Sequence, residues 1–486
     1  MKEKETLFAS VLISINCCVA GSIFGAPWGF VQAGWVFSIF LAVIALVSMI
    51  SLGMIVIQVL SRMSKLTKYT KFGYKINYVP LTHLLSPNPP DYYITKQLEY
   101  NGSSLILLEN EAEYKDHNMK YDFTMICKVL LGKNLEKVLN FLIVANNLVF
   151  LIGCSSSFAA SMAALVPIGP LKTCDIFENS SFVDICRYKY IFYIGLFSCI
   201  VSPMTLLFHF TESTFYLLAV AITRTFMICF MAFLCIFAFV SNTSLISSDV
   251  YETQSPAFNI MNFGVSAPII FLTMGFHLLI PDVYQALKDK PQNAPKLIVF
   301  SFSAAFFLIV LLSLSLAFGS TEVKQLATLN FSGFTFGHSI LNRPYWTFVA
   351  EFLISLYPCI DVTSIFSMTA VNVADNILAL HFDGLGDFVV DKDKVFYMRA
   401  YILIISFFMS GYFFDLGVVF ALAGSINMVF LFLFVIMFGI ASSALVPEKM
   451  QFDNFLANRG FLIGFFFVSL CFLTVMWISF ISYLMG

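Results

Sequence analysis

Long apolar runs separated by short polar stretches make up most of the chain. Eleven runs are long enough to be helices that cross a bilayer, for which about 20 predominantly apolar residues are needed. They lie at residues 7–31, 35–60, 138–166, 190–209, 215–240, 257–281, 297–318, 346–371, 396–413, 415–440 and 460–485. The ninth run is short and the tenth follows it closely, so ten or twelve spans remain alternatives. The first run is long, contains Gly and Pro and leads directly into the second, so we expect a span rather than a cleavable signal peptide.

Composition supports a membrane environment. Of 486 residues, 59% are hydrophobic and 12% are charged, and the mean hydropathy is +0.86. A soluble domain carries about 25% charged residues, so this chain has too few to cover a water-exposed surface. The net charge of −2 gives no sign of a nucleic-acid partner. We therefore expect an all-α integral membrane protein surrounded by lipids, and the sequence leaves its oligomeric state open.

Basic residues predict the orientation of the chain. Cytoplasmic loops carry an excess of Lys and Arg. With the N-terminus inside, segment 61–137 lies inside and holds eleven basic residues, while the outer loops hold only Lys172, Arg187, Lys189, Lys324 and Arg343. The N-terminus is therefore predicted to be cytoplasmic. Segment 61–137 mixes prolines, acids and lysines, and we expect a large cytoplasmic loop between spans 2 and 3 that ends in an amphipathic stretch, not a separate domain.

Three sequons and two cysteines favour the same orientation. The acceptors Asn179, Asn242 and Asn330 all fall in predicted outer or lumenal loops, which predicts N-glycosylation there, whereas a fourth acceptor, Asn101, falls in the inner loop and is expected to stay unmodified. Cys174 and Cys186 flank the first of these sequons, and an oxidising compartment would allow them to pair; a disulfide and two free thiols are both open. The remaining cysteines are scattered, no Cys-x-x-Cys or His-x-x-x-His occurs, and no metal site is predicted.

Two spans contain residues that interrupt helices. The first span includes two glycines and a proline within residues 21–27, which favours an unwound stretch with Pro27 early in a following half-helix. The sixth span has Pro268 and Gly275 on either side of an apolar run. Such residues also serve close packing and simple kinks in membrane helices. Interruptions at corresponding positions of two halves, however, indicate a transporter site at a repeat interface.

The residues around the first interruption resemble a known family. Residues 16–35, NCCVAGSIFGAPWGFVQAGW, look like the first-span motif of the amino acid/auxin permease family. Residues 129–150, 271–287 and 422–425 are similar to other stretches of that family. Ala20 and Ser22 depart from it, because they replace two of its glycines, so Gly21 and Gly25 would have to form the kink.

The resemblance implies a fold, a function and a substrate site. It implies a five-plus-five inverted repeat with broken first and sixth helices, and transport of amino acids by alternating access. Backbone at Gly21, Ser22, Ile23 and Gly25 would then bind the substrate carboxylate. Carbonyls near Phe271, Thr273 and Gly275 would meet its ammonium group.

Ionisable and polar residues inside the spans are candidates for ion coupling, because buried charge usually pairs or lies on a pathway. Arg224 in the fifth span and Asp361 in the eighth could pair structurally, or, like a basic residue in some members of the wider superfamily, act in coupling. Asn16, with Ser355 or Thr363, would favour Na⁺, whereas Arg224 and Asp361 favour H⁺ or plain exchange. His209 and His277 are expected near the interface. Of the adjacent Asn146 and Asn147, at most one is expected to face a cavity.

Other function classes remain as alternatives. Tyr121-Asp122 and Gly384-Leu385-Gly386-Asp387 match pairs found in presenilin-like aspartyl proteases, but both aspartates fall outside predicted spans and the Pro-Ala-Leu motif is absent. The protein is therefore not expected to be an enzyme or to need a cofactor other than a coupling ion. A nutrient sensor with a transporter-like fold, or a carrier of another small amine or carboxylate, stays open. The sequence chooses neither the amino acid nor the membrane, which would be a plasma membrane or a vacuolar or lysosomal one.

Overall fold

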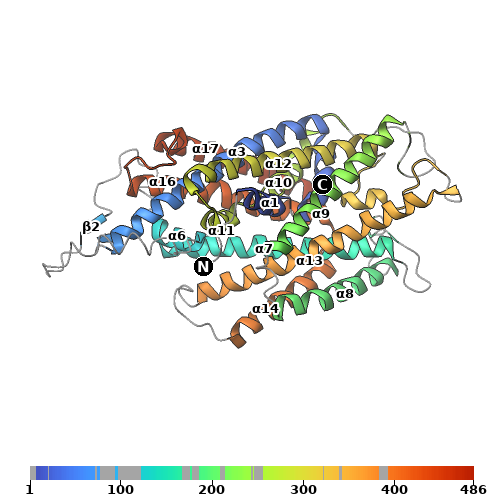
Figure 1. Cartoon of the computed structure of the whole chain (residues 1–486), viewed down its shortest axis with the longest axis horizontal. Coiled ribbons are helices and arrows are strands. Elements are labelled where there is room, and N and C mark those ends of the chain that lie inside the picture. Colours follow the sequence, from blue (N-terminus) through green and yellow to red (C-terminus); the bar gives the residue numbers. More distant parts are fainter. Residues whose placement is uncertain are drawn as a thin grey trace.

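The protein is a bundle of long helices, several of which lie side by side along its long axis (Figure 1). The computed structural model describes residues 7–19, 21–71, 74–76, 94–96, 122–166, 174, 176–177, 185–207, 214–241, 243, 245, 256–320, 322–338, 342–381 and 392–485. Within these residues, ten helices are long and apolar enough to cross a membrane. The expectation of an all-α multi-pass membrane protein is therefore confirmed.

The first half of the chain contains both strands of the described structure. Its elements are α1 (Leu7–Cys18), the 3₁₀ turn η1 (Gly21–Phe24), α2 (Ala26–Ala33), α3 (Trp35–Lys71), β1 (Tyr74–Ile76), β2 (Ile94–Lys96), α6 (Phe123–Leu131), α7 (Lys133–Leu165), α8 (Ile185–Leu207) and α9 (Thr214–Val240). The first predicted span consists of the three short pieces α1, η1 and α2. For that reason it is not among the ten long helices, and the total number of spans stays a prediction.

The elements of the second half, within its described residues, are all helices or helical turns. Its elements are η4 (Ile260–Asn262), α10 (Phe263–Leu272), η5 (His277–Leu279), α11 (Ile280–Ala286), α12 (Lys290–Gly319), η6 (Ala327–Phe331), α13 (Tyr345–His381), α14 (Lys392–Tyr412), α15 (Leu416–Val429), the π-helical segment η8 (Phe430–Val435), α16 (Ile436–Leu445), η9 (Phe455–Ala457) and α17 (Arg459–Met485). No proline or polar break separates α15, η8 and α16, so they run on as one span, Leu416–Leu445.

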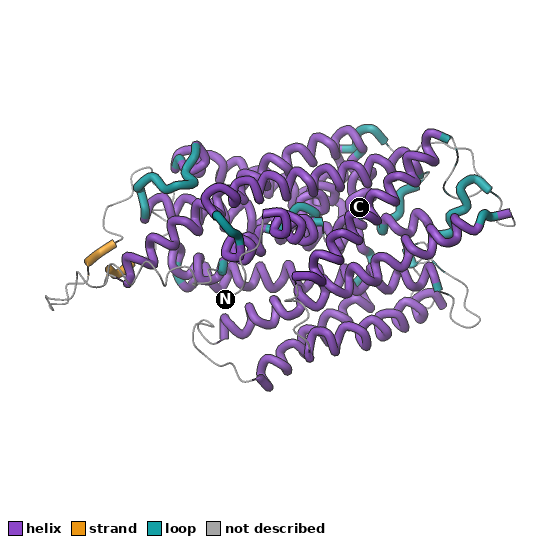
Figure 2. Tube along the Cα trace, in the orientation of Figure 1, coloured by secondary structure: helices purple, strands orange, loops and turns teal. Residues whose placement is uncertain are grey.

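Part of the predicted 61–137 loop is helix. At about 1.5 Å per residue, the 37 residues of α3 are longer than the roughly 30 Å hydrocarbon core of a bilayer. The helix accordingly continues to Lys71, past the predicted end of the second span at residue 60. Between α3 and α7 lie α6 and the antiparallel pair β1–β2, in which Tyr74 faces Lys96. Figure 2 shows the strands beyond one end of the bundle.

Large apolar side chains cover the outside of the bundle. On α14, Ile404 is 68% exposed and Phe408 is 63% exposed, and on α17 Val468 is 67% exposed. Side chains of this kind have no reason to face water. These side chains lie on the outer helices, where they would face lipid. The core between the helices is also mostly apolar.

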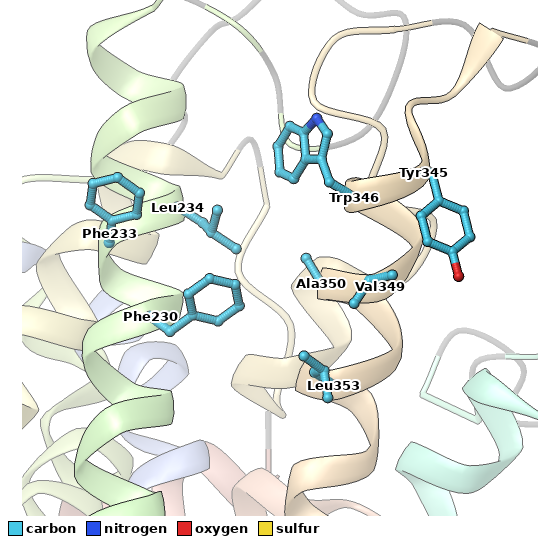
Figure 3. A pocket seen from close by; sticks show the side chains of 8 residues that line it. All are labelled: Phe230, Phe233, Leu234, Tyr345, Trp346, Val349, Ala350 and Leu353. Carbon is cyan, nitrogen blue, oxygen red and sulfur yellow. The ribbon is translucent and has the colours of Figure 1, made fainter.

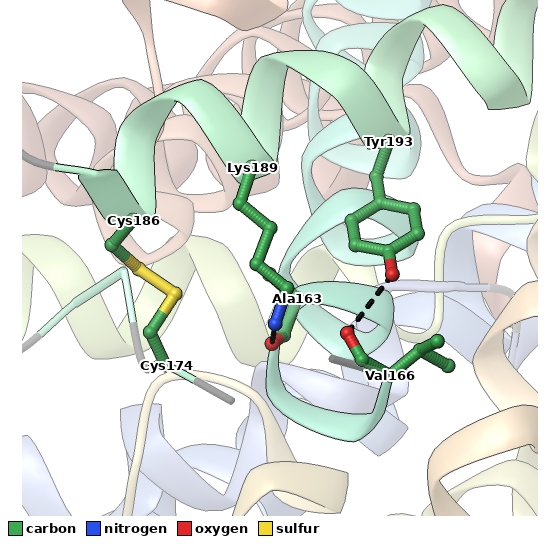
Figure 4. The surroundings of a disulfide bond; sticks show 6 residues. All are labelled: Ala163, Val166, Cys174, Cys186, Lys189 and Tyr193. Carbon is green, nitrogen blue, oxygen red and sulfur yellow. Dashed lines mark hydrogen bonds between the residues drawn. A yellow bond between two sulfur atoms is a disulfide. The ribbon is translucent and has the colours of Figure 1, made fainter. Parts of the chain in front are cut away.

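The start of α8 is joined to the end of α7 by two hydrogen bonds, and to the connection between the two helices by a disulfide (Figure 4). Cys174 and Cys186 form the disulfide, so the structure takes the paired alternative for these two residues. Lys189 Nζ donates to the Ala163 carbonyl at 2.9 Å, and Tyr193 Oη donates to the Val166 carbonyl at 3.0 Å. Carbonyls in the last turn of a helix lack partners within the helix, and here the Lys189 and Tyr193 side chains and the Cys174 amide, which also donates to the Ala163 carbonyl, supply donors.

The predicted glycan acceptor Asn330 is buried in the structure. Asn330 lies in η6 and is 1% exposed. Its Oδ1 accepts from the Lys324 amide at 3.0 Å, and its Nδ2 donates to the Ala327 carbonyl at 3.0 Å. An amide that is buried and hydrogen-bonded at both ends leaves no space for a sugar. Asn101, Asn179 and Asn242 lie outside the described residues.

Candidate functional site

The first span is interrupted where its glycines predict. Helix α1 ends at Cys18 and α2 begins at Ala26, with Pro27 in its first turn. Between them, η1 turns tightly, and the amide of Gly25 donates to the Ser22 carbonyl at 3.1 Å. Gly21, Ser22 and Ile23 are fully buried. The backbone therefore leaves α-helical geometry inside the protein, where membrane proteins tolerate it.

The sixth span is interrupted at its glycine rather than at its proline. Helix α10 ends at Leu272 and η5 begins at His277, so residues 273–276 form the break. The amide of Gly275 donates to the Leu272 carbonyl at 3.0 Å. Pro268 lies within α10, which continues past it. Only one of the two predicted helix breakers therefore makes the break.

One face of α15 lies across both interruptions. We call Gly417, Phe420, Gly424 and Asn427 the α15 stripe, because their spacing of three and four residues places them on one side of the helix. A Cβ at Gly25 would lie 2.8 Å from the Phe420 ring, and a Cβ at Gly275 would lie 2.6 Å from Asn427 Nδ2.

Between these two points, the stripe lies against α10 without space for a side chain. A Cβ at Gly424 would lie 2.1 Å from the carbonyl oxygen of Pro268. The half-helices also pack on each other, since a Cβ at Gly29 of α2 would lie 3.2 Å from Ile269 of α10. The two breaks and the α15 stripe therefore form one continuous structure.

A buried ion pair lies at the end of α1. Arg224 on α9 is 1% exposed and Asp361 on α13 is fully buried. Arg224 Nε donates to Asp361 Oδ1 at 2.7 Å, and Nη2 lies 2.5 Å from the same oxygen. Arg224 Nη1 donates to the main-chain carbonyl of Asn16. The pair thus joins two continuous helices to the backbone just before the first break.

Tyr357 belongs to this ion-pair cluster, although the sequence analysis missed it. It lies one helical turn before Asp361, and its hydroxyl interacts electrostatically with both charges without a hydrogen bond of standard geometry. Its ring packs edge-on against Phe24 of η1, with centroids 5.5 Å apart. The spacing of four residues from a buried aspartate was the available signal.

The residues predicted to bind Na⁺ lie on α1 and α13. Asn16 is buried and its Oδ1 has no hydrogen-bond partner. Ser355 is buried on α13. It lies six residues before Asp361, so the two side chains leave the helix in directions about 120° apart. The hydroxyl of Thr363 donates to the Cys359 carbonyl at 2.6 Å. The described residues contain no cluster of three or more His, Cys, Asp or Glu that could hold a metal ion.

Other predicted residues are buried around the two breaks. Phe271 packs its ring against Phe432 and Phe472, so only its backbone is available to a solute, and Thr273 donates its hydroxyl to the Ile270 carbonyl. Asn146 and Asn147 are both 7% exposed, and Asn146 Nδ2 donates to Asn147 Oδ1 at 3.4 Å.

The interfacial position expected for His277 is wrong. His277 begins η5, directly after the second break, and is 1% exposed. Its Nε2 lies 3.0 Å from the Met49 carbonyl of α3, and its ring lies 5.0 Å from that of Phe302 on α12. A carbonyl can only accept, so Nε2 carries the proton. The hydrophobic neighbours on α3 and α12 bury a residue that its polarity alone would place at the surface; His209 lies outside the described residues.

An apolar groove of about 470 Å³ lies between α9 and α13, away from both breaks (Figure 3). Its lining residues are Phe230, Phe233, Leu234, Tyr345, Trp346, Val349, Ala350 and Leu353. These side chains offer almost no hydrogen-bonding groups to a charged solute. The groove suits lipid chains, and the candidate site is instead the pair of breaks.

Asp122, one of the two aspartates in the protease alternative, has a structural role. Its carboxylate caps α6, with Oδ1 accepting from the Met125 amide at 2.7 Å. This is the ordinary role of an aspartate at a helix N-terminus. Asp387 lies outside the described residues.

Comparison with protein-family models finds no match to this chain, and comparison with curated proteins finds none. The similarity to the amino acid/auxin permeases therefore depends on the sequence motifs alone.

Proposed function

We propose that this protein is a secondary transporter that moves amino acids across a membrane by alternating access. The observation that carries the proposal is the pair of interrupted helices, which pack against each other under one face of α15. Interrupted helices at a repeat interface characterise the binding sites of many transporters, because unwound backbone offers amides and carbonyls that a continuous helix keeps for itself.

The chemistry of the two breaks suits a zwitterion. Glycine at position 21 lets a solute approach the backbone closely, and amides of residues 21–23 would donate to a carboxylate, whereas the Gly25 amide already donates to the Ser22 carbonyl. Carbonyls of Phe271, Thr273 and Gly275 at the second break would accept from an ammonium group. The first-span resemblance supplies the substrate class, and with it the five-plus-five repeat.

The Arg224–Asp361 pair would couple transport to an ion. Arg224 already places a positive charge against the Asn16 carbonyl, which reduces the attraction of that position for Na⁺. We therefore favour H⁺ over Na⁺ as the coupling ion. Asp361 Oδ1 accepts a hydrogen bond from Arg224 Nε and makes the ion-pair contact with Nη2, while Oδ2 has no hydrogen-bond partner and would be the oxygen that receives a proton.

We further propose that the N-terminus is cytoplasmic. The excess of Lys and Arg in segment 61–137 supports this orientation. The Cys174–Cys186 disulfide supports it independently, because a disulfide between α7 and α8 belongs on an oxidising, extracellular or lumenal side. Either a plasma membrane or a vacuolar or lysosomal membrane would satisfy both.

Uptake into proteoliposomes tests the proposal. Purified protein would be reconstituted and offered a panel of radiolabelled L-amino acids, with the pH gradient and the Na⁺ gradient varied separately. We expect uptake of a subset of amino acids that is stimulated by an inward proton gradient. Specific binding without uptake under any gradient would instead indicate a sensor, and neither binding nor uptake of any amino acid would remove the substrate class.

A further inference from the structure

Asn427 is a buried polar residue to which the site described above assigns no role. Its side chain is 3% exposed on the α15 stripe, between apolar neighbours. Its Nδ2 has no hydrogen-bond partner among the described residues. A buried N–H donor without an acceptor costs free energy, and native proteins keep such groups where another molecule satisfies them.

The amide of Asn427 lies against the second break. A Cβ at Gly275 would lie 2.6 Å from Asn427 Nδ2 and 3.1 Å from the Leu272 carbonyl. Any larger residue at position 275 would displace the amide. The glycine and the asparagine therefore fit each other, and the donor is at the backbone where the sixth span leaves helical geometry.

The helix itself is irregular next to Asn427. The π-helical segment η8 begins at Phe430, three residues after Asn427. Short π-helical segments inside α-helices are rare and occur frequently at functional sites. This irregularity is independent of the unpaired amide, and both point to the same place on the tenth span.

We propose that Asn427 selects the substrate by donating a hydrogen bond to an acceptor on its side chain. This inference depends on the proposed transport of amino acids. The ammonium group has no lone pair to offer Nδ2, and the carboxylate is assigned to the first break, so the acceptor belongs to the substrate's side chain. The preferred class is amino acids whose side chains carry an amide, hydroxyl or carboxylate oxygen.

The preference for such side chains would follow from the cost of leaving a buried donor unpaired. An apolar side chain at the second break would leave Nδ2 buried and unpaired, whereas an oxygen would satisfy it. For this reason, a binding site that hydrogen-bonds its substrate rejects analogues that lack the polar group. We expect the wild-type protein to prefer L-glutamine over L-methionine, which is of similar size, by about tenfold or more in kcat/KM.

Two substitutions and one control test this role. Asn427→Leu removes the amide at similar volume, and Asn427→Asp exchanges the N–H donor for a carboxylate oxygen, which can only accept. Asn140→Leu is the control, because Asn140 is also a buried asparagine in a span, but its Nδ2 already donates to the Asn376 carbonyl at 2.9 Å. Initial rates of uptake of L-glutamine and L-methionine would be measured for each variant in proteoliposomes.

Both Asn427 variants should lose most of the glutamine preference, through a higher KM for glutamine and an unchanged KM for methionine. The control variant should keep the wild-type ratio even if its total uptake falls. Equal loss for both substrates in Asn427→Leu, or a wild-type protein that prefers methionine, would overturn the role of Asn427. Failure of the wild-type protein to take up any amino acid would instead overturn the transport proposal.

Discussion

Two buried pairs of arginine and aspartate join distant parts of this bundle, and their surroundings differ. Arg224 and Asp361 are 1% and 0% exposed on α9 and α13, and the arginine also reaches the Asn16 carbonyl just before an interrupted helix. Arg62 on α3 pairs with Asp453 at 2.9 Å, and these side chains are 4% and 9% exposed. Residue types and burial are similar, but the connected elements are not.

The second pair joins a continuous helix to a connection. Asp453 lies between α16 and α17, and its Oδ2 also accepts from the Met450 amide at 2.9 Å. Nearby, Gln58 Nε2 donates to the Phe452 carbonyl at 3.1 Å and to Asn454 Oδ1 at 2.9 Å. These bonds fix the course of residues 450–454 along α3, so the Arg62 pair is structural.

This difference favours the Arg224–Asp361 pair as the one that would take part in the proposed transport. Any displacement of α1 relative to α9 and α13 must break the bond from Arg224 to Asn16. Displacement of the first half-helix is the kind of motion by which a central site opens to one side. The two ion pairs are similarly buried, so burial does not distinguish them. The hydrogen bond from Arg224 to the Asn16 carbonyl does.

The largest effect is expected for Asp361→Ala. Removing one partner of a buried pair leaves an uncompensated charge, which costs about 3–5 kcal/mol. We expect loss of uptake and a large fall in thermal stability, measured by uptake in proteoliposomes and by thermal unfolding in detergent. Wild-type stability of this variant would show that Arg224 is not buried as described.

Gly25→Ala should abolish uptake through geometry rather than charge. Its Cβ would lie 2.8 Å from the Phe420 ring, and misplacing a binding group by about 1 Å costs roughly 100-fold in rate. Adding Phe420→Leu should restore part of the uptake, because it removes the ring. Gly195→Ala is the control, since a Cβ at Gly195 meets no atom within 4 Å. Unchanged uptake by Gly25→Ala would remove the first break from the site.

Asp453→Ala should have a smaller effect. Arg62 would lose its carboxylate partner but keep the bond from Nη1 to Ser442 Oγ, so the loss costs about 1–3 kcal/mol. We expect reduced thermal stability and a KM equal to that of the wild type in uptake measurements on the folded fraction. A change in KM or in ion dependence would place this pair in the mechanism and erase the contrast.

The smallest effect is expected for His277→Gln. The Gln amide can still donate to the Met49 carbonyl, as His277 Nε2 does at 3.0 Å, so uptake should stay within about twofold. His277→Leu should lower stability by about 1–3 kcal/mol, because the carbonyl loses its donor. Thermal unfolding of the two variants measures the difference, and equal stabilities would show that the hydrogen bond contributes nothing.

The sequence predicts the interruptions well because glycine and proline act on the backbone locally. The breaks at residues 21–27 and at Gly275 could be predicted without knowing which residues surround them. The Arg224–Asp361 pair could be predicted because apolar spans contain few other charged residues. Pro268 misled because a proline within a helix is tolerated where neighbouring helices support it.

Tertiary packing decides what the sequence does not predict. Phe420 and Asn427 lie next to the breaks because they are on the face of α15 that packs there. The tenth span is mostly apolar on all sides, so its sequence does not predict which face that is. The burial of Asn330 could not be predicted, because a sequon reports three residues and not their surroundings. His277 was mispredicted for the same reason, since the aromatic ring of Phe302 and the carbonyl of Met49 come from other helices.

The most direct test compares two double variants in one uptake experiment. Arg224→Leu/Asp361→Leu and Arg62→Met/Asp453→Leu each replace a pair by apolar residues, which leaves no unpaired charge and preserves folding. We expect both double variants to fold. Arg224→Leu/Asp361→Leu should lose transport, while Arg62→Met/Asp453→Leu should take up substrate within about threefold of the wild type. Normal transport by the Arg224/Asp361 double variant would contradict this expectation.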